Sequence, residues 1–443
     1  MSIFRGTPEA EEARRAHEAA LTDTPRPQEL SQDWLHRLCL ESGADDAGFV
    51  ELGRPELGEE NDHARRLFPA TATLISLVAV TNRDAIRSVS RATANETWHH
   101  EGDRLAHAAA AVLRGLAEKG VRGLATSIGF PMDMHASDGR NFWDIAHKTV
   151  AVEAGMGHMG VNRNVIHPRF GNFVLLDTVL IDATLDHYGR PLDYNPCLGC
   201  NLCVAVCPVG AIHPDGEFDG FACLNHNYRE FLFGFTDWVD TLAASGDVST
   251  YRAKFREPET LSWWQSLSFG PNYKSAYCQA VCPAGEDVIG PYLADQKRWR
   301  DDVVLPLVHL KEPVYVASGT PAEQAAKRKK AKHVRYIDFQ PDVSTAANFR
   351  LGILHRFDRT RAAGAAVRIE FEFPDGRVSV VIENDRISVS TEPLAESDAV
   401  VTCGDQHYIR LLHPQPTDVP DPAVPVKTSG DPSALTRLLG CLT

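Results

Sequence analysis

The feature that most constrains this chain is a run of four cysteines that ends in a proline. The residues Cys197, Cys200, Cys203, Cys207 and Pro208 have the spacing C-x2-C-x2-C-x3-C-P. This spacing is typical of [4Fe–4S] ligands, in which the first three thiolates hold one cluster and the fourth reaches a second cluster. Zinc sites more often use cysteine pairs separated by longer gaps. The motif therefore predicts an iron–sulfur redox protein.

A partial second copy of the motif lies about 75 residues downstream, where Cys278 and Cys282 precede Pro283. We expect Cys282 to complete the first cluster with Cys197, Cys200 and Cys203. The second cluster would take Cys207, Cys223 and Cys278, which leaves it one thiolate short, because Ser275 stands where the pattern calls for cysteine. Its fourth ligand could be Ser275, a nearby His or Asp, or water. A three-iron cluster, or the loss of the second cluster, is equally open.

The charge and hydropathy of the chain restrict its expected partners and its expected location in the cell. The formal net charge of −14 disfavours nucleic acid as the main partner, because phosphate binding needs a basic footprint. One basic stretch, residues 327–335, is interpreted as a solvated helix face or linker. The sequence has no apolar run of about 18 residues and no apolar segment after its N-terminal arginine pair. We therefore expect a cytoplasmic protein without a membrane span.

Hydrophobic periodicity divides the chain into five parts, with residues 1–30 as a flexible segment. Residues 31–190 are expected to form a layered α+β domain with a helix over 31–42, strands at 47–52, 73–80 and 172–182, and a helix from Arg104 to Glu118. Residues 191–300 hold the cysteines, and residues 301–340 read as a connection. Residues 341–443 alternate in hydropathy around Asp375-Gly376, which predicts a hairpin in a small α+β domain.

A glycine-rich turn precedes the cysteines. Gly155, Gly157 and Gly160 match G-x-G-x-x-G, a pattern of dinucleotide-binding folds. That fold requires a helix after the turn, whereas Pro168 and Gly171 follow here without helical periodicity. The context therefore disfavours nicotinamide binding.

The stretch AHKTVAVEAGMGHMGVNRNVIHPRFGNFVLLDTVLID, followed by the cysteine run, resembles the corrinoid-dependent reductases, namely the epoxyqueuosine reductases and reductive dehalogenases. The resemblance covers about residues 30–300. It implies a nitroreductase-like corrinoid-binding core and a ferredoxin-like module with two clusters. It also implies cobalamin held without a His ligand, and an electron donor such as ferredoxin or flavodoxin. The residues carried over to cofactor binding are Gly155, Gly157, Gly160, Asn162 and His158.

The chain departs from the epoxyqueuosine reductases at two places. Asn141 stands where that family has an acid, with Asp144 three residues later, and the family's lysine in the turn is replaced by Val161. We therefore expect a shared scaffold with a different substrate. That substrate would be a small or hydrophobic organic molecule, reduced by dehalogenation or dehydroxylation. The candidate catalytic residues are Asp144, Asn141, His147 and His158. The alternatives are an iron–sulfur electron-transfer protein and a corrinoid reactivase, neither with an organic substrate of its own.

The C-terminal part resembles the sterol-carrier-protein-2 family. The matching segments are FEFPDGRVSVVIENDRISVS, AVVTCGDQHYIRLL and VKTSGDPSALTRLL, in that family's order. The resemblance implies an apolar tunnel for a lipid-like ligand. A purely structural or dimerising domain is the alternative.

Overall fold

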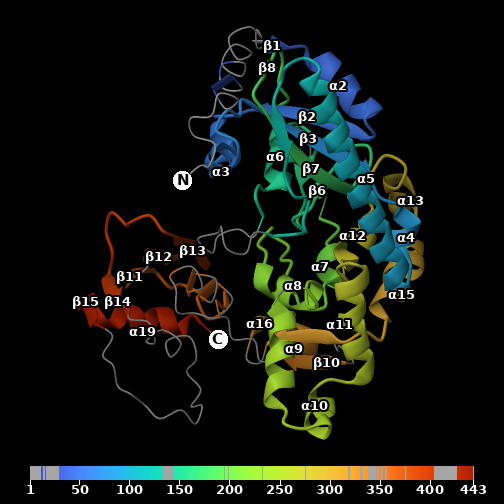
Figure 1. The fold of residues 1–443 in the computed structure, drawn as a ribbon. Coiled ribbons are helices and arrows are strands. Elements are labelled where there is room, and N and C mark those ends of the chain that lie inside the picture. The colour runs from blue at the N-terminus through green and yellow to red at the C-terminus, as the bar shows by residue number, and fades with distance from the viewer. Residues whose placement is uncertain are drawn as a thin grey trace.

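The computed structural model describes most of the chain and places the predicted parts in space. The described residues are 11–12, 15, 29–132, 143–193, 195–197, 199–231, 233–274, 276–317, 320–329, 333–337, 346, 349–350, 353–354, 357–374, 376–403 and 427–442. Figure 1 shows a sheet-containing domain at the top, the cysteine-bearing helices below it and a C-terminal sheet to one side. The predicted mixture of α and β layers is confirmed.

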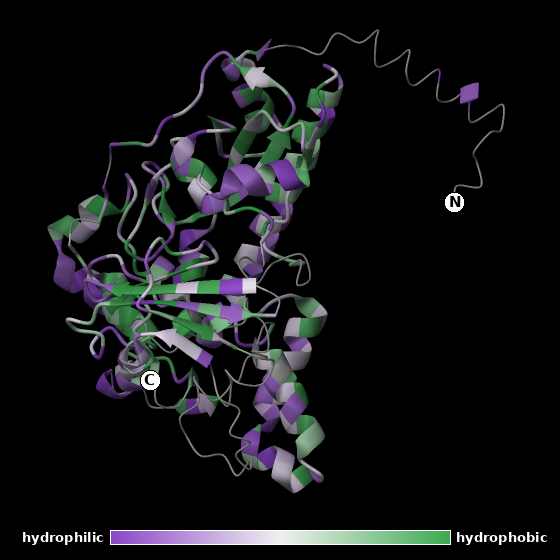
Figure 2. Cartoon of the chain, turned by 90° about the vertical axis from the view of Figure 1, so that its left-hand side faces the viewer, coloured by the Kyte–Doolittle hydropathy of each residue, from purple (hydrophilic) through white to green (hydrophobic). Residues whose placement is uncertain are grey.

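An antiparallel sheet of four strands forms the first domain. Its order is β2 (Asp46–Glu51), β3 (Thr73–Val80), β7 (Val174–Ile181) and β4 (Gly123–Ala125). The continuous apolar run of β3 predicted a strand buried on both faces, and its residues are buried almost throughout. Figure 2 shows the strands of this sheet largely in the hydrophobic colour.

Helices cover both faces of the sheet. α2 (Gln32–Glu41) and α5 (Arg91–Ala117) share an apolar core with one face, and α6 (His147–Glu153) packs on the other. α5 begins thirteen residues before the predicted start at Arg104 and therefore includes Trp98, His99 and His100. None of the helices in the described residues is long and apolar enough to cross a membrane. The domain is completed by shorter elements: β1 (Glu29–Leu30), a 3-10 turn (Pro55–Leu57), α3 (Glu60–Leu67), α4 (Arg83–Arg87), β5 (His158–Met159), β6 (Val165–Ile166) and β8 (Thr184–Leu185).

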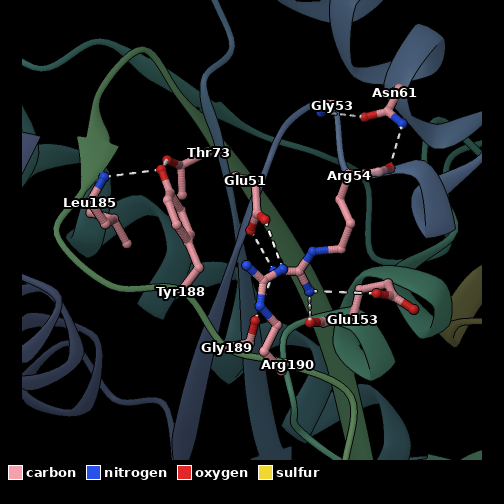
Figure 3. Close-up of polar contacts among 10 residues, drawn as sticks. All are labelled: Glu51, Gly53, Arg54, Asn61, Thr73, Glu153, Leu185, Tyr188, Gly189 and Arg190. Atoms are coloured by element: carbon pink, nitrogen blue, oxygen red, sulfur yellow. Dashed lines mark hydrogen bonds and ion pairs between the residues drawn. The ribbon is translucent and has the colours of Figure 1, made fainter.

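A buried arginine fixes the chain where it leaves this domain for the cysteine-rich part (Figure 3). The Arg54 guanidinium contacts Glu51 and Glu153, and it donates to the Gly189 carbonyl at 2.8 Å. These contacts connect the end of β2, the end of α6 and the segment that runs on to Cys197. Because Arg54 is almost fully buried, its carboxylate partners are needed to offset the cost of desolvating the charge.

The cysteine-rich part is helical. It contains α7 (Leu202–Val206), α8 (Gly220–Asn227), α9 (Phe233–Ala244), α10 (Val248–Lys254), α11 (Glu257–Phe269), α12 (Tyr277–Ala280), α13 (Ile289–Ala294), α14 (Gln296–Trp299), a π-helical turn (Arg300–Val304) and α15 (Leu305–Val308). Helices α9 to α11 form a projection between Cys223 and Cys278 (Figure 1).

The segment read as a connection forms ordered structure. β9 (Val314–Ala317) and β10 (Val334–Ile337) pair in parallel and are joined through α16 (Pro321–Arg328). Val314, Val316 and Ala326 share an apolar core with Cys207. This unit therefore packs directly on the cysteine-rich part, and its contacts were not predicted from its Pro- and Lys-rich composition.

The C-terminal part forms a sheet of five strands with the order β13 (Arg386–Ser390), β12 (Gly376–Glu383), β11 (Val367–Phe373), β14 (Ala399–Thr402) and β15 (Lys427–Gly430). α19 (Pro432–Gly440) packs against the sheet around Leu438. The alternating pattern around Asp375-Gly376 predicted the hairpin of β11 and β12, which pair antiparallel, whereas β15 was not predicted. The expected helix at residues 405–412 lies outside the described residues, and the likeness to sterol carrier proteins stays a prediction.

Candidate iron–sulfur centre and neighbouring polar residues

Two short helices present the cysteines in equivalent ways. α7 follows Asn201 and α12 follows Ala276, and both of these residues adopt left-handed backbone conformations, with φ of 51° and 50°. Each stands two residues before a cysteine, Cys203 or Cys278, and each helix runs into a Cys-Pro pair. The two segments, which we call the first and second half-motifs, are therefore structural repeats. This is expected for a module in which the last thiolate of each segment binds the cluster of the other segment.

The first predicted ligand set surrounds one pocket. Cys197, Cys200, Cys203 and Cys282 all line a cavity of about 290 Å³. Cys282 comes from a segment 75 residues after Cys207, so only the fold could bring it to the other three. This arrangement matches the predicted assignment of Cys282 to the first cluster.

The second set gathers beside the first. Cys207, Cys223 and Cys278 contribute to one apolar core, and the charges of Cys207 and Cys278 both act on Cys223. Ser275, the predicted fourth ligand, lies outside the described residues. Asp219, which precedes α8, also acts electrostatically on Cys223, and a nearby Asp was one of the alternatives for this position.

The sulfur atoms lie in surroundings that disfavour free thiolates. Burial raises the pKa of Cys203, Cys278 and Cys282 to about 12, so a positively charged iron centre would be needed to hold them deprotonated. The backbone N–H of Val161 donates to Cys197 Sγ at 3.4 Å, and that of Ala211 donates to Cys207 Sγ at 3.3 Å. Within the described ranges, no three His, Cys, Asp or Glu side chains are placed to hold a single metal ion.

The glycine-rich turn packs against protein rather than open space. A Cβ atom on Gly157 would lie 2.5 Å from the Ile166 carbonyl oxygen, and Gly155 and Gly160 are similarly crowded, by Arg190 and Ile166. The turn leads to Asn162, which lines the first cysteine pocket and donates from Nδ2 to the Cys278 carbonyl at 3.3 Å. The glycines therefore let the turn pack closely against Ile166 and Arg190.

The four predicted catalytic residues fall in different settings. Asn141 lies outside the described residues, and Asp144 is half-buried just before α6. Both ring nitrogens of His147 are used within the protein, Nδ1 with Thr178 Oγ1 at 2.8 Å and Nε2 with the Ser127 carbonyl at 2.9 Å. This ring therefore ties α6 to the sheet. His158 is half-buried in β5, at the glycine-rich turn.

Lys148, Tyr228 and Tyr273 lie near the second cysteine set. Lys148 is solvent-exposed and the tyrosines are half-buried. Burial lowers the pKa of Lys148 and raises the pKa of both tyrosines, because it disfavours the charged form of each group. Cys223 and Cys278 act electrostatically on Lys148 and Tyr228, and Tyr273 contacts Tyr228.

Sequence reasoning did not single out the two tyrosines. Tyr228 and Tyr273 meet edge-on with ring centroids 5.4 Å apart, and Tyr273 meets Trp98 of α5 at the same distance. Both tyrosines come from the region between Cys223 and Cys278, in which aromatic residues are frequent. This high frequency of aromatic residues between two predicted ligand cysteines is the sequence feature that could have pointed to the two tyrosines.

The comparisons with known proteins agree with the iron–sulfur prediction. A family model described as a 4Fe-4S binding domain matches residues 191–213, which confirms a [4Fe–4S] site in this segment. The epoxyqueuosine reductase of Bacillus cereus is 30% identical over 81 residues, which are 18% of this chain and 21% of the relative. That of Leadbetterella byssophila is 36% identical over 91 residues, 20% of this chain and 29% of the relative. The chain thus spans less than a third of these relatives.

Solved structures give weaker similarity. An epoxyqueuosine reductase with an epoxyqueuosine-modified tRNA stem loop has a TM-score of 0.32 and 17% identity, covering 45% of this chain and 60% of the other. A B12-dependent reductive dehalogenase has a TM-score of 0.38 and 13% identity, covering 67% of this chain and 35% of the other. At these scores the matches do not establish a common fold.

One prediction has to be corrected. The acidic net charge led us to expect a small-molecule substrate and no nucleic-acid partner, whereas one of the similar epoxyqueuosine reductases was solved with a tRNA stem loop. The exclusion was wrong because net charge averages over the whole surface, while nucleic-acid binding depends on the local footprint.

Proposed function

We propose that this chain is an iron–sulfur oxidoreductase of the epoxyqueuosine reductase kind, in which two clusters deliver electrons one at a time to a reaction centre beside Lys148 and Tyr228. The observation that supports the proposal is that seven cysteines gather in two adjoining sets, the second of which acts electrostatically on Lys148 and Tyr228. Electrons that enter at the first set would thus leave beside these two side chains.

Lys148, Tyr228 and Tyr273 offer hydrogen-bond donors for a cobalamin. Lys148 Nζ donates to the Arg163 carbonyl and to Asn164 Oδ1, at 2.7 and 3.0 Å, which leaves one ammonium proton for a ligand. The two tyrosine hydroxyls can donate to amide oxygens such as those at the rim of a corrin. His147 has no free ring nitrogen, in keeping with a cobalt that has no His ligand. Cobalamin, when bound, supplies a cobalt centre that accepts electrons from the clusters and reduces the substrate.

The protein's own residues would then bind and orient the substrate and protonate the product. Burial keeps the hydroxyls of Tyr228 and Tyr273 protonated, since it raises their pKa, so either can supply a proton to a reduced product. Asp144, just before α6, remains a proposed acid, and Asn141 remains a proposed hydrogen-bonding group. The reaction would be reductive removal of an oxygen or halide substituent. The names of the relatives make an epoxyqueuosine nucleotide in tRNA the first substrate to assay.

The test is anaerobic expression with iron and hydroxocobalamin, followed by assays of iron, sulfide and cobalt per chain and by EPR. We expect about seven or eight irons and about one cobalt per chain. The iron count depends on whether the second cluster, with Ser275 in place of a cysteine, holds three or four irons. Cys200→Ser should lose iron from the first cluster. Cys441→Ser is the matched control, because Cys441 donates to the Arg437 carbonyl at 3.2 Å, far from the clusters in the C-terminal core, and serine can keep that bond.

Turnover is then measured with a reductant and an epoxyqueuosine-containing tRNA stem loop. Conversion to the deoxygenated nucleotide would establish the function. Clusters without cobalt, and without turnover, would contradict it and favour an electron-transfer protein instead. Clusters and cobalt with no tRNA turnover would place the protein among reductases of another oxygenated or halogenated substrate.

A further inference from the structure

Lys329 is held at the end of the first half-motif. Its Nζ donates to the carbonyls of Val204, Ala205 and Cys207, at 2.6, 3.1 and 2.7 Å. These are carbonyls at the C-terminal end of α7, where a helix leaves acceptors unpaired and favours a cation. Lys329 belongs to the basic stretch that was interpreted as a solvated face, but its ammonium is instead fixed beside a cluster residue.

Arg87 occupies the corresponding place at the second half-motif. From α4 of the first domain, its Nε donates to the Ala280 carbonyl at 3.0 Å and its Nη2 donates to the Cys282 carbonyl at 3.3 Å. The guanidinium also stacks on the rings of Phe173 and Trp299, at 5.0 and 4.7 Å from their centroids. Four contacts therefore fix the position of this charge.

The two cations meet equivalent atoms. Ala205 and Cys207 stand two and four residues after Cys203, and Ala280 and Cys282 stand two and four residues after Cys278. Lys329 and Arg87 come from unrelated segments, one after α16 and the other in α4, so no sequence repeat produces the match. Helix capping alone requires only a hydrogen-bond donor at the C-terminal end of each helix. Here each helix end has a full positive charge instead. This charge lies at the cysteine that the half-motif contributes to the cluster of the other half-motif.

A fixed charge at this place acts on electron transfer. A cluster becomes more negative when it accepts an electron, so a neighbouring cation stabilises the reduced form and raises the reduction potential. The charge of Lys329 interacts with Cys207 and, less, with Cys203. The charge of Arg87 interacts with Cys282.

We propose that Arg87 and Lys329 are paired positioning residues, each of which holds the crossover cysteine of one cluster and sets that cluster's reduction potential. Arg87 acts on the first cluster, through Cys282, and Lys329 acts on the second, through Cys207. The proposal rests on the proposed function in requiring both clusters, but it does not depend on the substrate or on cobalamin.

The test is an EPR-monitored redox titration of the iron-loaded full chain. Arg87→Gln and Lys329→Gln remove the charge and keep N–H donors, while Arg87→Lys and Lys329→Arg keep the charge. Lys327→Gln is the matched control, because Lys327 lies two residues before Lys329, at the end of α16, as an exposed partner of Glu323. We expect Arg87→Gln to lower the potential of the first cluster and Lys329→Gln that of the second. The charge-retaining variants and the control should stay near wild type.

The outcomes separate the two proposals. Absence of iron in the wild-type protein would refute the proposed function. Wild-type iron with unmoved potentials in both glutamine variants would overturn the paired-cation inference alone, as would equal shifts of both clusters in either variant. If one glutamine variant fails to retain its cluster, the other half of the pair decides the result, since each cation makes its own prediction.

Discussion

At the scale of single residues, Asp177 is a buried carboxyl in the middle of the core sheet. Its Oδ1 accepts the Thr178 N–H at 2.7 Å, and its Oδ2 has no hydrogen-bond partner in the described structure. Burial raises the pKa of Asp177 to about 7. Its ordinary value is 3.8, so between about pH 4 and 7 the unfolded chain loses this proton and the folded chain keeps it. Stability therefore falls across this window and levels off above it.

We predict that Asp177→Asn removes this loss. The variant should be more stable than wild type at pH 8, by on the order of a few kcal/mol, and the difference should shrink towards pH 4. Apparent melting temperatures of the iron-loaded protein from pH 5 to 8 measure it. Asp62→Asn, at an exposed carboxylate 3.4 Å from Arg65, is the control and should follow the wild-type profile. Parallel pH profiles for Asp177→Asn and wild type would contradict the prediction.

At the scale of elements, the turn before β7 lies very close to the cysteine module. Gly171 has a φ of 64°, and a Cβ there would lie 1.8 Å from the Ala284 carbonyl oxygen, just after Cys282 and Pro283. We predict that Gly171→Ala displaces this segment and lowers first-cluster occupancy, with a backbone cost of roughly 1–3 kcal/mol. Iron content and thermal unfolding measure both effects. Gly290→Ala in α13 has open space around its Cβ and no positive φ, so it should retain all its iron.

The second half-motif carries a prediction about cluster composition. Ser275 stands three residues before Cys278, as Cys200 stands before Cys203. We predict that Ser275→Cys supplies the missing thiolate, so that iron per chain rises to about eight and any three-iron EPR signal disappears. Ser275→Ala distinguishes a serine ligand from a water or aspartate ligand, because only a serine ligand makes the alanine variant differ from wild type. An unchanged EPR spectrum in Ser275→Cys would count against this ligand position.

The sequence predicted these elements unevenly, and the reasons are physical. Local spacing encodes the cysteine half-motifs and the strands. It does not encode the first half of α5, because residues 91–103 include Thr, Asn, His, Gly and Asp, which are weak helix formers. That half is stabilised by tertiary contacts, such as Asn95 Nδ2 with Asn272 Oδ1 at 2.9 Å. Arg87, Lys329, Tyr228 and Tyr273 were missed because their partners are distant in sequence and only the fold brings them together.

At the scale of the whole molecule, the C-terminal sheet contacts the turn between Cys207 and Cys223. Arg359 pairs with Asp215, and Arg386 Nε lies 3.2 Å from Glu217 Oε1. All four side chains are well exposed, from 38% to 57%. Exposed ion pairs contribute about 0.2–1 kcal/mol each and weaken with salt. This contact is therefore marginal, and it adjoins the loop that carries second-cluster ligands.

We predict that the double variant Arg359→Glu/Arg386→Glu releases the C-terminal domain, because each attraction becomes a repulsion against Asp215 or Glu217. Small-angle scattering should show a larger radius of gyration at low salt, and wild type should approach the same value as salt rises. Iron content should stay at the wild-type level, since none of the four residues is a predicted ligand. Adding Asp215→Arg/Glu217→Arg restores opposite charges and should restore the compact dimensions. Unchanged dimensions in the charge-reversed protein would show that contacts other than these two ion pairs hold the domains together.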